Sequence, residues 1–346
     1  MKYVLYFLFL FFLLQGCRKE SKSSQISGKK GSDTVATQKP DTGWYPIASL
    51  PGPRAYATGF SLNGKGYVGG GSPSLSAPNA AGYNDMYMYD PAKNSWTEKA
   101  WLPAVVYQSL GRNLPFSFVI NNVAYAGGGM NTGGVGGNDV ESYDTVKNVW
   151  ATVATFGNVY SGGFGYSVAA SIGGRGYIFS YDSGDNAIYT FDPRINTLVY
   201  AISVQGLNYL FSGQWLGASD TQLLYGWGNS DAPVVSIDTA NNHAYHQTFY
   251  PQPSNGYTNL VNKSVVAING IFYKNYMYVS FGDAGNLCRY NFTTDLWQPV
   301  STRNLGVTGN AANFLIGSYL YMVGGNNATN SSSTGQAWKI NLDAYP

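Results

Sequence analysis

Two arginines stand at matching places in this sequence of 346 residues and could bind an anion. Arg54 and Arg112 each lie ten positions before a residue of an expected tight turn, Gly64 and Asn122 respectively. Two neighbouring guanidinium groups can hold a carboxylate or sulfate through paired, charge-assisted hydrogen bonds. The alternative is that each arginine ties down nearby backbone carbonyls. On the first interpretation, Arg54 would bind a ligand and contribute little to folding.

Aromatic and acidic residues accompany these arginines in segments expected to form loops. Aromatic rings can stack on sugars, and carboxylates accept hydrogen bonds from sugar hydroxyls. The same aromatics could instead pack the core, but as a set they favour a glycan, with a protein partner left open. The expected ligand-binding face comprises Arg54, Arg112, Trp101, Tyr107, Asp182 and Asp283.

Metal and acid–base chemistry have little support in the sequence. The two histidines, His243 and His246, are three positions apart, so a strand would point them to opposite faces. After residue 43 the only glutamates are Glu98 and Glu141, and neither is expected at the face where a ligand would bind. A general base would therefore have to be an aspartate. We expect no metal and no cofactor, and no catalytic residue can be assigned.

These residues belong to a repeated unit of ~50 residues. The full pattern is a Gly pair, an alternating run that ends in Tyr-Asp, and then a Trp. The Gly pair is intact at Gly69-Gly70, Gly127-Gly128 and Gly324-Gly325 and is replaced in the other three units. The second member of the Tyr-Asp anchor, or of its substitute, falls at positions 90, 144, 192, 238, 291 and 341. The Trp anchor is Trp44, Trp96, Trp150 and Trp297, with Leu198 and Tyr245 as substitutes. Aromatic and β-branched alternation within the units predicts strands.

Over residues 44–346 this pattern resembles the kelch family of β-propellers. The resemblance implies an all-β, six-bladed propeller, in which each blade is a four-stranded antiparallel sheet beside a central channel. Trp44 precedes the first Gly unit, whereas no Trp follows the last Tyr-Asp equivalent. Residues 44–50 are therefore expected to supply the outer strand of the last blade and to close the ring. The resemblance also implies that the long connections emerge on one face, at the channel mouth.

The resemblance leaves two functions open. The first is a ligand-binding module for carbohydrate or protein, without catalysis. The alternative is a sugar mutarotase or epimerase, because the family includes a six-bladed mutarotase that acts on sialic acid and uses Arg and Glu. Copper chemistry of the galactose oxidase kind is disfavoured, since it needs a Tyr crosslinked to Cys, and Cys288 lies in an apolar run.

Residues 1–17 are expected to be a lipoprotein signal peptide. The apolar run over residues 3–14 is too short to span a bilayer, which needs ~20 residues. It leads into a segment that resembles a bacterial lipobox, with Cys17 as the lipidated residue, although an ordinary cleaved signal peptide is the alternative. Arg18, where an Asp would favour the inner membrane, favours the outer membrane. Residues 18–43 are Ser-rich and lack aromatics, so we expect a disordered tether.

The charge of the expected propeller bears on nucleic-acid binding, and its cysteine content bears on disulfide bonds. Residues 44–346 contain 13 Lys and Arg against 15 Asp and Glu, so no basic face for nucleic acid is expected. With Cys17 lipidated, Cys288 alone remains, which excludes an intrachain disulfide and predicts a buried structural thiol. We therefore expect a monomer in the cell envelope that reaches the membrane only through its lipid anchor.

Overall fold

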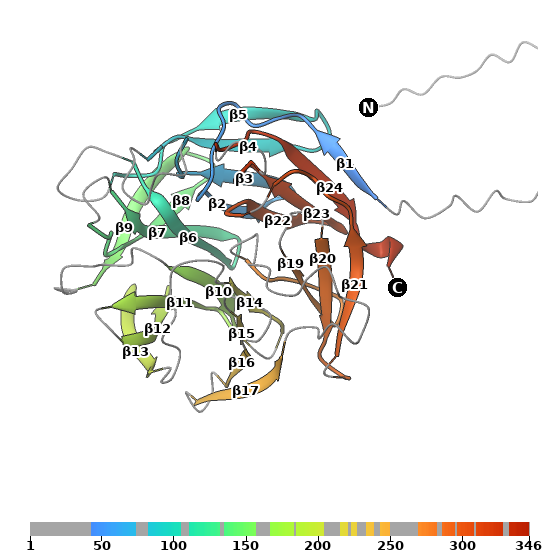
Figure 1. Cartoon of the computed structure of the whole chain (residues 1–346). Coiled ribbons are helices and arrows are strands. Elements are labelled where there is room, and N and C mark those ends of the chain that lie inside the picture. The colour runs from blue at the N-terminus through green and yellow to red at the C-terminus, as the bar shows by residue number, and fades with distance from the viewer. Residues whose placement is uncertain are drawn as a thin grey trace, which may run out of the picture. The chain divides into compact units, whose positions relative to one another are not determined.

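Strands and tight turns account for almost all of the regular structure in the part of the chain that the structure describes (Figure 1). The computed structural model describes residues 43–73, 82–104, 111–131, 135–156, 167–182, 185–203, 215–220, 223–226, 233–238, 243–249, 269–281, 286–294, 296–307, 309–327 and 332–345. These residues all lie in the second of two compact units, Pro40–Pro346. Within these ranges no helix is long and apolar enough to cross a membrane. The predicted all-β class is confirmed.

The strands pair into four-stranded antiparallel sheets, and the first three follow the chain order. The first sheet comprises β2 (Thr58–Leu62), β3 (Lys65–Gly69), β4 (Met86–Asp90) and β5 (Ser95–Lys99). The second comprises β6 (Asn113–Ile120), β7 (Val123–Met130), β8 (Asp139–Asp144) and β9 (Val149–Thr155). The third comprises β10 (Val168–Ile172), β11 (Arg175–Asp182), β12 (Asp185–Asp192) and β13 (Thr197–Ser203).

Two further sheets continue this order, and the last one combines both ends of the unit. The fourth sheet comprises β14 (Trp215–Ala218), β15 (Leu223–Gly226), β16 (Pro233–Asp238) and β17 (His243–Phe249). The fifth comprises β18 (Ile271–Tyr273), β19 (Tyr276–Ser280), β20 (Asn286–Asn291) and β21 (Leu296–Thr302). The sixth comprises β22 (Ala312–Ile316), β23 (Tyr319–Val323), β24 (Ala337–Asn341) and β1 (Trp44–Ile47), and a 3-10 helix, η2 (Leu342–Ala344), follows β24.

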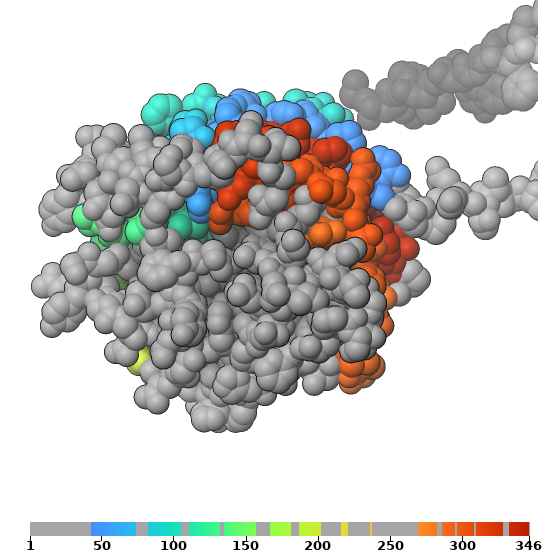
Figure 2. Space-filling view, viewed as in Figure 1, coloured from blue at the N-terminus to red at the C-terminus, as the bar shows by residue number. Residues whose placement is uncertain are grey.

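Strand β1 lies beside β24, although the two are almost the whole described chain apart. Trp44 is opposite Ile340 and Ile47 is opposite Ala337 in an antiparallel ladder. Figure 2 shows the corresponding blue and red surfaces adjoining. Trp44 is 1% exposed and packs in a cluster with Ile340 and Tyr278, so it also joins the fifth sheet to the sixth.

The first strand of every sheet contributes to one central cavity of about 270 Å³. Its walls are small, amide, aliphatic and aromatic residues, and none of the residues that line it is charged. They include Ser61 of β2, Ser117 of β6, Ser171 of β10, Ala218 of β14, Phe272 of β18 and Asn313 of β22. The fourth strands lie outermost (Figure 1). One edge of each sheet, its first strand, therefore faces this cavity.

Neighbouring sheets pack through a phenylalanine against a position that only glycine can fill. A Cβ atom on Gly66 would lie 2.1 Å from the ring of Phe314, and one on Gly176 would lie 2.4 Å from the ring of Phe118. Each ring comes from the first strand of the preceding sheet. Because glycine lets the ring approach the backbone, the sheets bury large aromatic areas against each other.

The predicted tight turns between first and second strands are confirmed in five of the six sheets. Asn63 and Gly64 both have positive φ values, 52° and 69°, as do Asn121 and Asn122. Two residues with positive φ make the turn that matches the twist of a hairpin. The turn after β14 is wider, because β15 begins only at Leu223.

Other boundaries differ from the prediction. The fourth strands β9, β13 and β21 extend into segments expected to be connections, because their uncharged alternation continues past the Trp position. Asp182 was expected within a loop, but it ends β11 and is paired with Asp185 across a tight connection. The predicted buried thiol is confirmed, since Cys288 is 1% exposed and burial raises its pKa to about 12.

A side-chain clamp joins the sixth sheet to the first. Asn94, in the turn before β5, has a φ of 47° and accepts hydrogen bonds from the Ala48 amide and the Tyr89 hydroxyl, both at 2.9 Å. The indole Nε1 of Trp96 donates to the Ala48 carbonyl at 2.8 Å. The backbone amide and carbonyl that follow β1 are thus both satisfied by the next sheet.

The same clamp joins the first sheet to the second. Asn148 accepts from the Ala100 amide at 3.0 Å and from the Tyr143 hydroxyl at 2.6 Å. Trp150 donates from Nε1 to the Ala100 carbonyl at 3.0 Å. This geometry explains why Tyr, Asn and Trp recur at fixed spacing in these units.

Replacing Asn94 with Gly should lower the free energy of unfolding by ~1–3 kcal/mol, because it leaves the Ala48 amide and the Tyr89 hydroxyl without their acceptor. Glycine keeps the positive φ, so the change isolates the side-chain bonds. Asn63→Gly, at an exposed turn with a φ of 52°, is the matched control and should change stability little. Urea unfolding of both variants checks this. Equal losses would mean that the clamp does not join the sheets.

Candidate functional site

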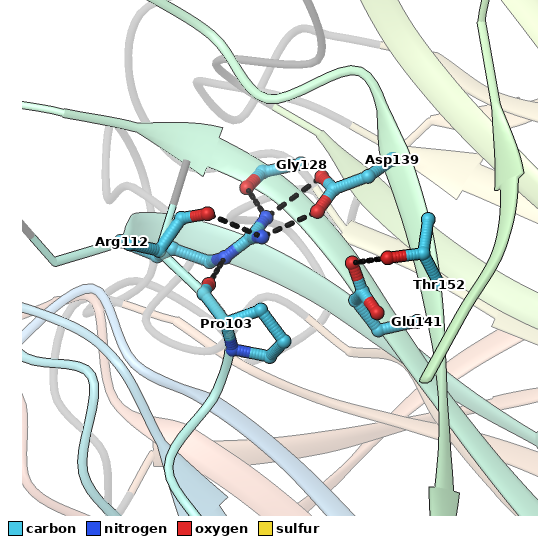
Figure 3. Close-up of polar contacts among 7 residues, drawn as sticks. Pro103, Arg112, Gly128, Asp139, Glu141 and Thr152 are labelled. Carbon is cyan, nitrogen blue, oxygen red and sulfur yellow. Dashed lines mark hydrogen bonds and ion pairs between the residues drawn. The ribbon is translucent and has the colours of Figure 1, made fainter. Parts of the chain in front are cut away.

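Arg112, just before β6, fastens separate parts of the second sheet together (Figure 3). It is 1% exposed. Its Nη1 donates to the Gly128 carbonyl and to Asp139 Oδ1, both at 2.8 Å, and its Nη2 pairs with Asp139 Oδ2. Nε donates to the carbonyl of Pro103, in the connection from the first sheet. The hydrogen-bond donors of this guanidinium are therefore bonded to acceptors within the protein.

Arg54, just before β2, repeats the arrangement in the first sheet and is also 1% exposed. Nη1 donates to Asp85 Oδ1 at 2.7 Å and to the Gly70 carbonyl at 3.2 Å. Nη2 donates to Asp85 Oδ2 at 2.9 Å and to the Pro51 carbonyl at 3.3 Å. The two-bond pairing of a guanidinium with one carboxylate is the strongest form of this ion pair.

Two tyrosine rings lie over the Arg54 guanidinium. No such ring contact is described for Arg112. The Arg54 Cζ atom lies 4.6 Å from the ring centre of Tyr83 and 5.3 Å from that of Tyr87. Burial, and after it the neighbouring Asp85 carboxylate, raises the pKa of Tyr87. Asp85 remains partly open, with its side chain 18% exposed, against 4% for Asp139. The first-sheet ion pair is therefore the one that solvent reaches.

The backbone of each arginine connects to the preceding sheet. Gly71 donates its amide to the Arg112 carbonyl at 2.7 Å, and Gly325 donates to the Arg54 carbonyl at 2.8 Å. A Cβ atom on Gly324 would lie 2.5 Å from the Arg54 carbonyl oxygen. The Gly pairs are needed here because backbone passes directly over backbone.

Glu141 forms the buried end of the Arg112 cluster (Figure 3). It is 2% exposed, and its Oε1 accepts from the Thr152 hydroxyl at 2.9 Å. Burial, together with the adjacent Asp139 carboxylate, raises the pKa of Glu141 to about 7. Burial alone would also raise the pKa of Asp139, but the hydrogen bonds and charge of Arg112 outweigh it and leave that pKa below its usual value. One proton thus sits on Glu141 at neutral pH or just below.

Strained backbone lines the approach to the first strands of adjacent sheets. Tyr56, Leu114 and Asn310 have φ values of 60°, 57° and 54°. The Tyr56 amide donates to the Asn310 carbonyl, and the Leu114 amide donates to the Tyr56 carbonyl, both at 2.9 Å. A positive φ costs a non-glycine residue ~1–3 kcal/mol, so these bonds hold the rim against that strain.

The structure places the predicted ligand-binding residues in different settings. Arg54 and Arg112 tie down carbonyls and carboxylates, so the expectation that Arg54 contributes little to folding is wrong. Trp101 is 60% exposed, and its Nε1 donates to Glu98 Oε1 at 2.5 Å. Cys17, Tyr107 and Asp283 lie outside the described residues, and of Asp182 only the backbone is described. Ligand contact at this face stays a prediction.

Three carboxylates of the site were not predicted. Asp85 and Asp139 each follow an Asn where the third strand of a sheet begins, in the two units that contain the arginines. This repeated Asn-Asp pair could have indicated the partners of the arginines. Glu141 is two positions after Asp139, which places both side chains on the same face of β8. Within the described ranges no three His, Cys, Asp or Glu side chains converge as metal ligands would.

Comparison with known proteins supports the propeller assignment. No protein-family model matches the chain. A solved structure described as "Structure of YjhT" superposes with a TM-score of 0.60 at 15% identity, over 86% of this chain and 97% of that one. The resemblance to kelch-repeat β-propellers is confirmed. N-acetylneuraminate epimerase of Escherichia coli O157:H7 is 34% identical over 98 residues, which are 28% of this chain and 25% of the epimerase. The Shigella flexneri enzyme of the same name is 34% identical over 96 residues.

Replacing Arg54 with Ala should destabilise the propeller by ~1.5–3 kcal/mol, because the change removes the charge-assisted hydrogen bonds that the buried guanidinium donates to Asp85. Arg175→Ala is the matched control. The Arg175 side chain is 47% exposed and lies 3.6 Å from Asp192, so its loss should cost at most ~1 kcal/mol. Chemical unfolding of both variants measures the difference. Similar stabilities would show that the Arg54 pair does not hold the fold.

The free energy of unfolding should fall as pH rises from about 4.5, the ordinary pKa of a glutamate, to about 7, the pKa of folded Glu141. Over this interval the folded chain keeps a proton that the unfolded chain releases. Glu141→Gln should remove this part of the pH dependence. Glu98→Gln, at an exposed position, should not. Unfolding curves at several pH values test this, and an unchanged slope in Glu141→Gln would contradict it.

Proposed function

We propose that this kelch propeller acts on a sugar, as a mutarotase or epimerase, at the face where the long connections emerge. The observation that carries the proposal is the segment 34% identical to N-acetylneuraminate epimerase. The chain covers a quarter of that enzyme's length, so the activity itself is inferred. The central cavity has an uncharged lining, in which the side chains of Ser61, Ser117, Ser171, Asn269 and Asn313 stand among mostly apolar residues.

Anomer exchange needs a base and an acid but no oxidant. The base removes the proton of the anomeric hydroxyl while the acid protonates the ring oxygen, and the bond between the anomeric carbon and the ring oxygen breaks. Closure on the other face of the resulting carbonyl reverses both proton transfers. Asp85 is the proposed base, because it is partly exposed and Arg54 fixes its orientation. Tyr87, which interacts with Asp85 and has a raised pKa, stays protonated and is the proposed acid.

A second candidate is a carbohydrate- or protein-binding module without catalysis. It is favoured by the pairing of Asp85 with Arg54 and of Asp139 with Arg112, since both carboxylates already accept hydrogen bonds from a guanidinium and are less available to a ligand. Burial removes Glu141 from direct contact with a ligand. Under this proposal Trp101 and the undescribed Tyr107 and Asp283 contribute contacts rather than chemistry.

Nuclear magnetic resonance exchange spectroscopy on sugar anomers separates the two candidates. The purified propeller should accelerate exchange, and Asp85→Asn should slow the accelerated rate by ~100-fold or more, the usual contribution of a positioned acid or base. Asp144→Asn, in an exposed turn, should leave the rate unchanged. Saturable binding with no acceleration would establish the binding module in place of the enzyme.

We further propose that the six sheets are the blades of one ring that β1 closes. The support is that all six first strands line a single cavity, and that β1 pairs with β24. Arg303, after the fifth sheet, also donates to the Trp44 carbonyl at 2.7 Å. Each of these contacts joins sheets that a closed ring would place side by side.

We propose that the protein is a lipid-anchored protein of the cell envelope, with residues 18–43 as its tether and the propeller monomeric. The support is the sequence that ends in Cys17, which lies outside the described residues. Cys17→Ala should abolish labelling by a fatty-acid analogue and release the protein from the membrane fraction. Retained labelling would contradict the anchor.

A further inference from the structure

We propose that the third sheet carries a second binding site, which takes a carboxylate joined to an aromatic or branched aliphatic group. The C-terminal residue of a peptide and a small N-acylated amino acid share this chemistry. The site is a pocket of about 240 Å³ on β11, β12 and β13 (Figure 1). The described residues that line it include Arg175, Tyr177, Thr190, Ile195, Val199 and Tyr200. It is separate from the proposed sugar site, which belongs to the first sheet.

The pocket occupies one face of the third sheet. Tyr177, Thr190 and Val199 lie opposite one another on three adjacent strands, so their side chains project to the same side. Ile178 and Tyr189 project to the other side and pack in a cluster with phenylalanines of the second sheet. Tyr177 and Thr190 are buried, whereas Val199 is exposed, so the pocket has a buried floor and an open rim.

The corresponding face of the first sheet is filled. There the ring of Tyr67 packs edge-on against Tyr143 of the second sheet, with ring centres 5.9 Å apart. Met88, opposite Tyr67, packs against the same cluster. The third sheet has Thr190 at the position of Met88. In sequence the fourth unit has Ile237, whose side chain lies outside those described, at the position of Tyr143. Both replacements are smaller, so less of this face is filled.

Arg175 supplies a cation at the edge of the pocket. Arg194 donates from Nε to Asp192 Oδ1 at 2.9 Å and pairs through Nη2 with Asp192 Oδ2. The Nε atom of Arg175 lies 3.6 Å from the same Oδ2, and its side chain is 47% exposed. In the first sheet the equivalent Lys65 approaches Asp90 to 2.8 Å. Because Arg194 takes up the Asp192 carboxylate, the Arg175 guanidinium can form a two-bond pair with a second carboxylate.

Apolar side chains form the rest of the opening. Ile195, Val199 and Tyr200 are exposed where they line the pocket. Exposed apolar groups gathered at a cavity with polar groups beside them mark a binding site. A cavity of ~150 Å³ holds benzene, so a pocket of about 240 Å³ can receive a phenyl ring or a leucine side chain. The pocket thus offers contact for an apolar group and a cation for the carboxylate next to it.

The first test is a calorimetric titration of the full chain with N-acetylphenylalanine and with its amide, which lacks the carboxylate. The acid should bind at least about tenfold more tightly than the amide. Added salt should weaken the affinity for the acid, because Arg175 is exposed to solvent. Equal affinities for the acid and the amide, or binding of neither, would overturn the proposal.

A short peptide that ends in phenylalanine distinguishes the two sources of this chemistry. Tighter binding of the peptide than of N-acetylphenylalanine would support a protein C-terminus as the ligand. Equal binding would support a small acid, because the rest of the peptide then adds no contact. In both cases amidation of the peptide should weaken its binding, and peptide binding that survives amidation would count against a carboxylate site.

Variants locate the site. Arg175→Gln should weaken binding of N-acetylphenylalanine by about tenfold or more and have little effect on the amide. Thr190→Met, which introduces the residue of the first sheet, should fill the pocket and weaken binding of both compounds. Lys147→Ala, at an exposed lysine beside Asp144 in the second sheet, is the matched control and should bind normally. Unfolding curves confirm that the variants fold. Unchanged affinity in both pocket variants would overturn the assignment of the site.

Discussion

The hydrogen bonds from one asparagine side chain to the backbone of the neighbouring sheet are the interaction on which the described structure depends. Each sheet is narrow, and its outer strand is followed by a chain segment whose amide and carbonyl must find partners. Asn94 with Trp96 supplies both to Ala48, and Asn148 with Trp150 supplies both to Ala100. In the third sheet Asn196 keeps the same left-handed backbone, but Phe191 and Leu198 take the places of the Tyr and the Trp. There, aromatic and aliphatic packing against the second sheet carries the contact instead.

Nearer the central cavity, Arg54 and Arg112 also join neighbouring sheets. Arg54 and Arg112 each bind their own sheet through the guanidinium and the preceding sheet through the carbonyl. Their guanidinium groups are paired with Asp85 and Asp139, so each arginine orders its own sheet and the connection that leads into it. The partners of an arginine side chain therefore say more about whether it can bind a ligand than the presence of an arginine at that face does.

The fold was largely predictable because its constraints are local and repeated. The spacing of Gly pairs, Tyr-Asp and Trp reports close backbone approach and the inter-sheet clamp, so periodicity led to the strands and to most of the tight turns. The site was less predictable. Whether Arg54 faces a ligand or Asp85 depends on a contact between residues 31 positions apart, which no local pattern fixes. The raised pKa of Glu141 depends on burial and on the carboxylate beside it, and β-strand alternation could have suggested the second but not the first.

Pairing of β1 with β24 also has a consequence for the order in which the protein can be made. Strand β1, Trp44–Ile47, has its hydrogen-bonding partner in Ala337–Asn341, which follows all five other sheets in the sequence. Sheets one to five can assemble from contiguous segments as they emerge, but the sixth must wait until β24 has been translated. Until then Trp44 has no burial site and the edge of β24 does not exist. Any chaperone or translocation machinery that handles the nascent chain therefore meets it with its first strand still unpaired.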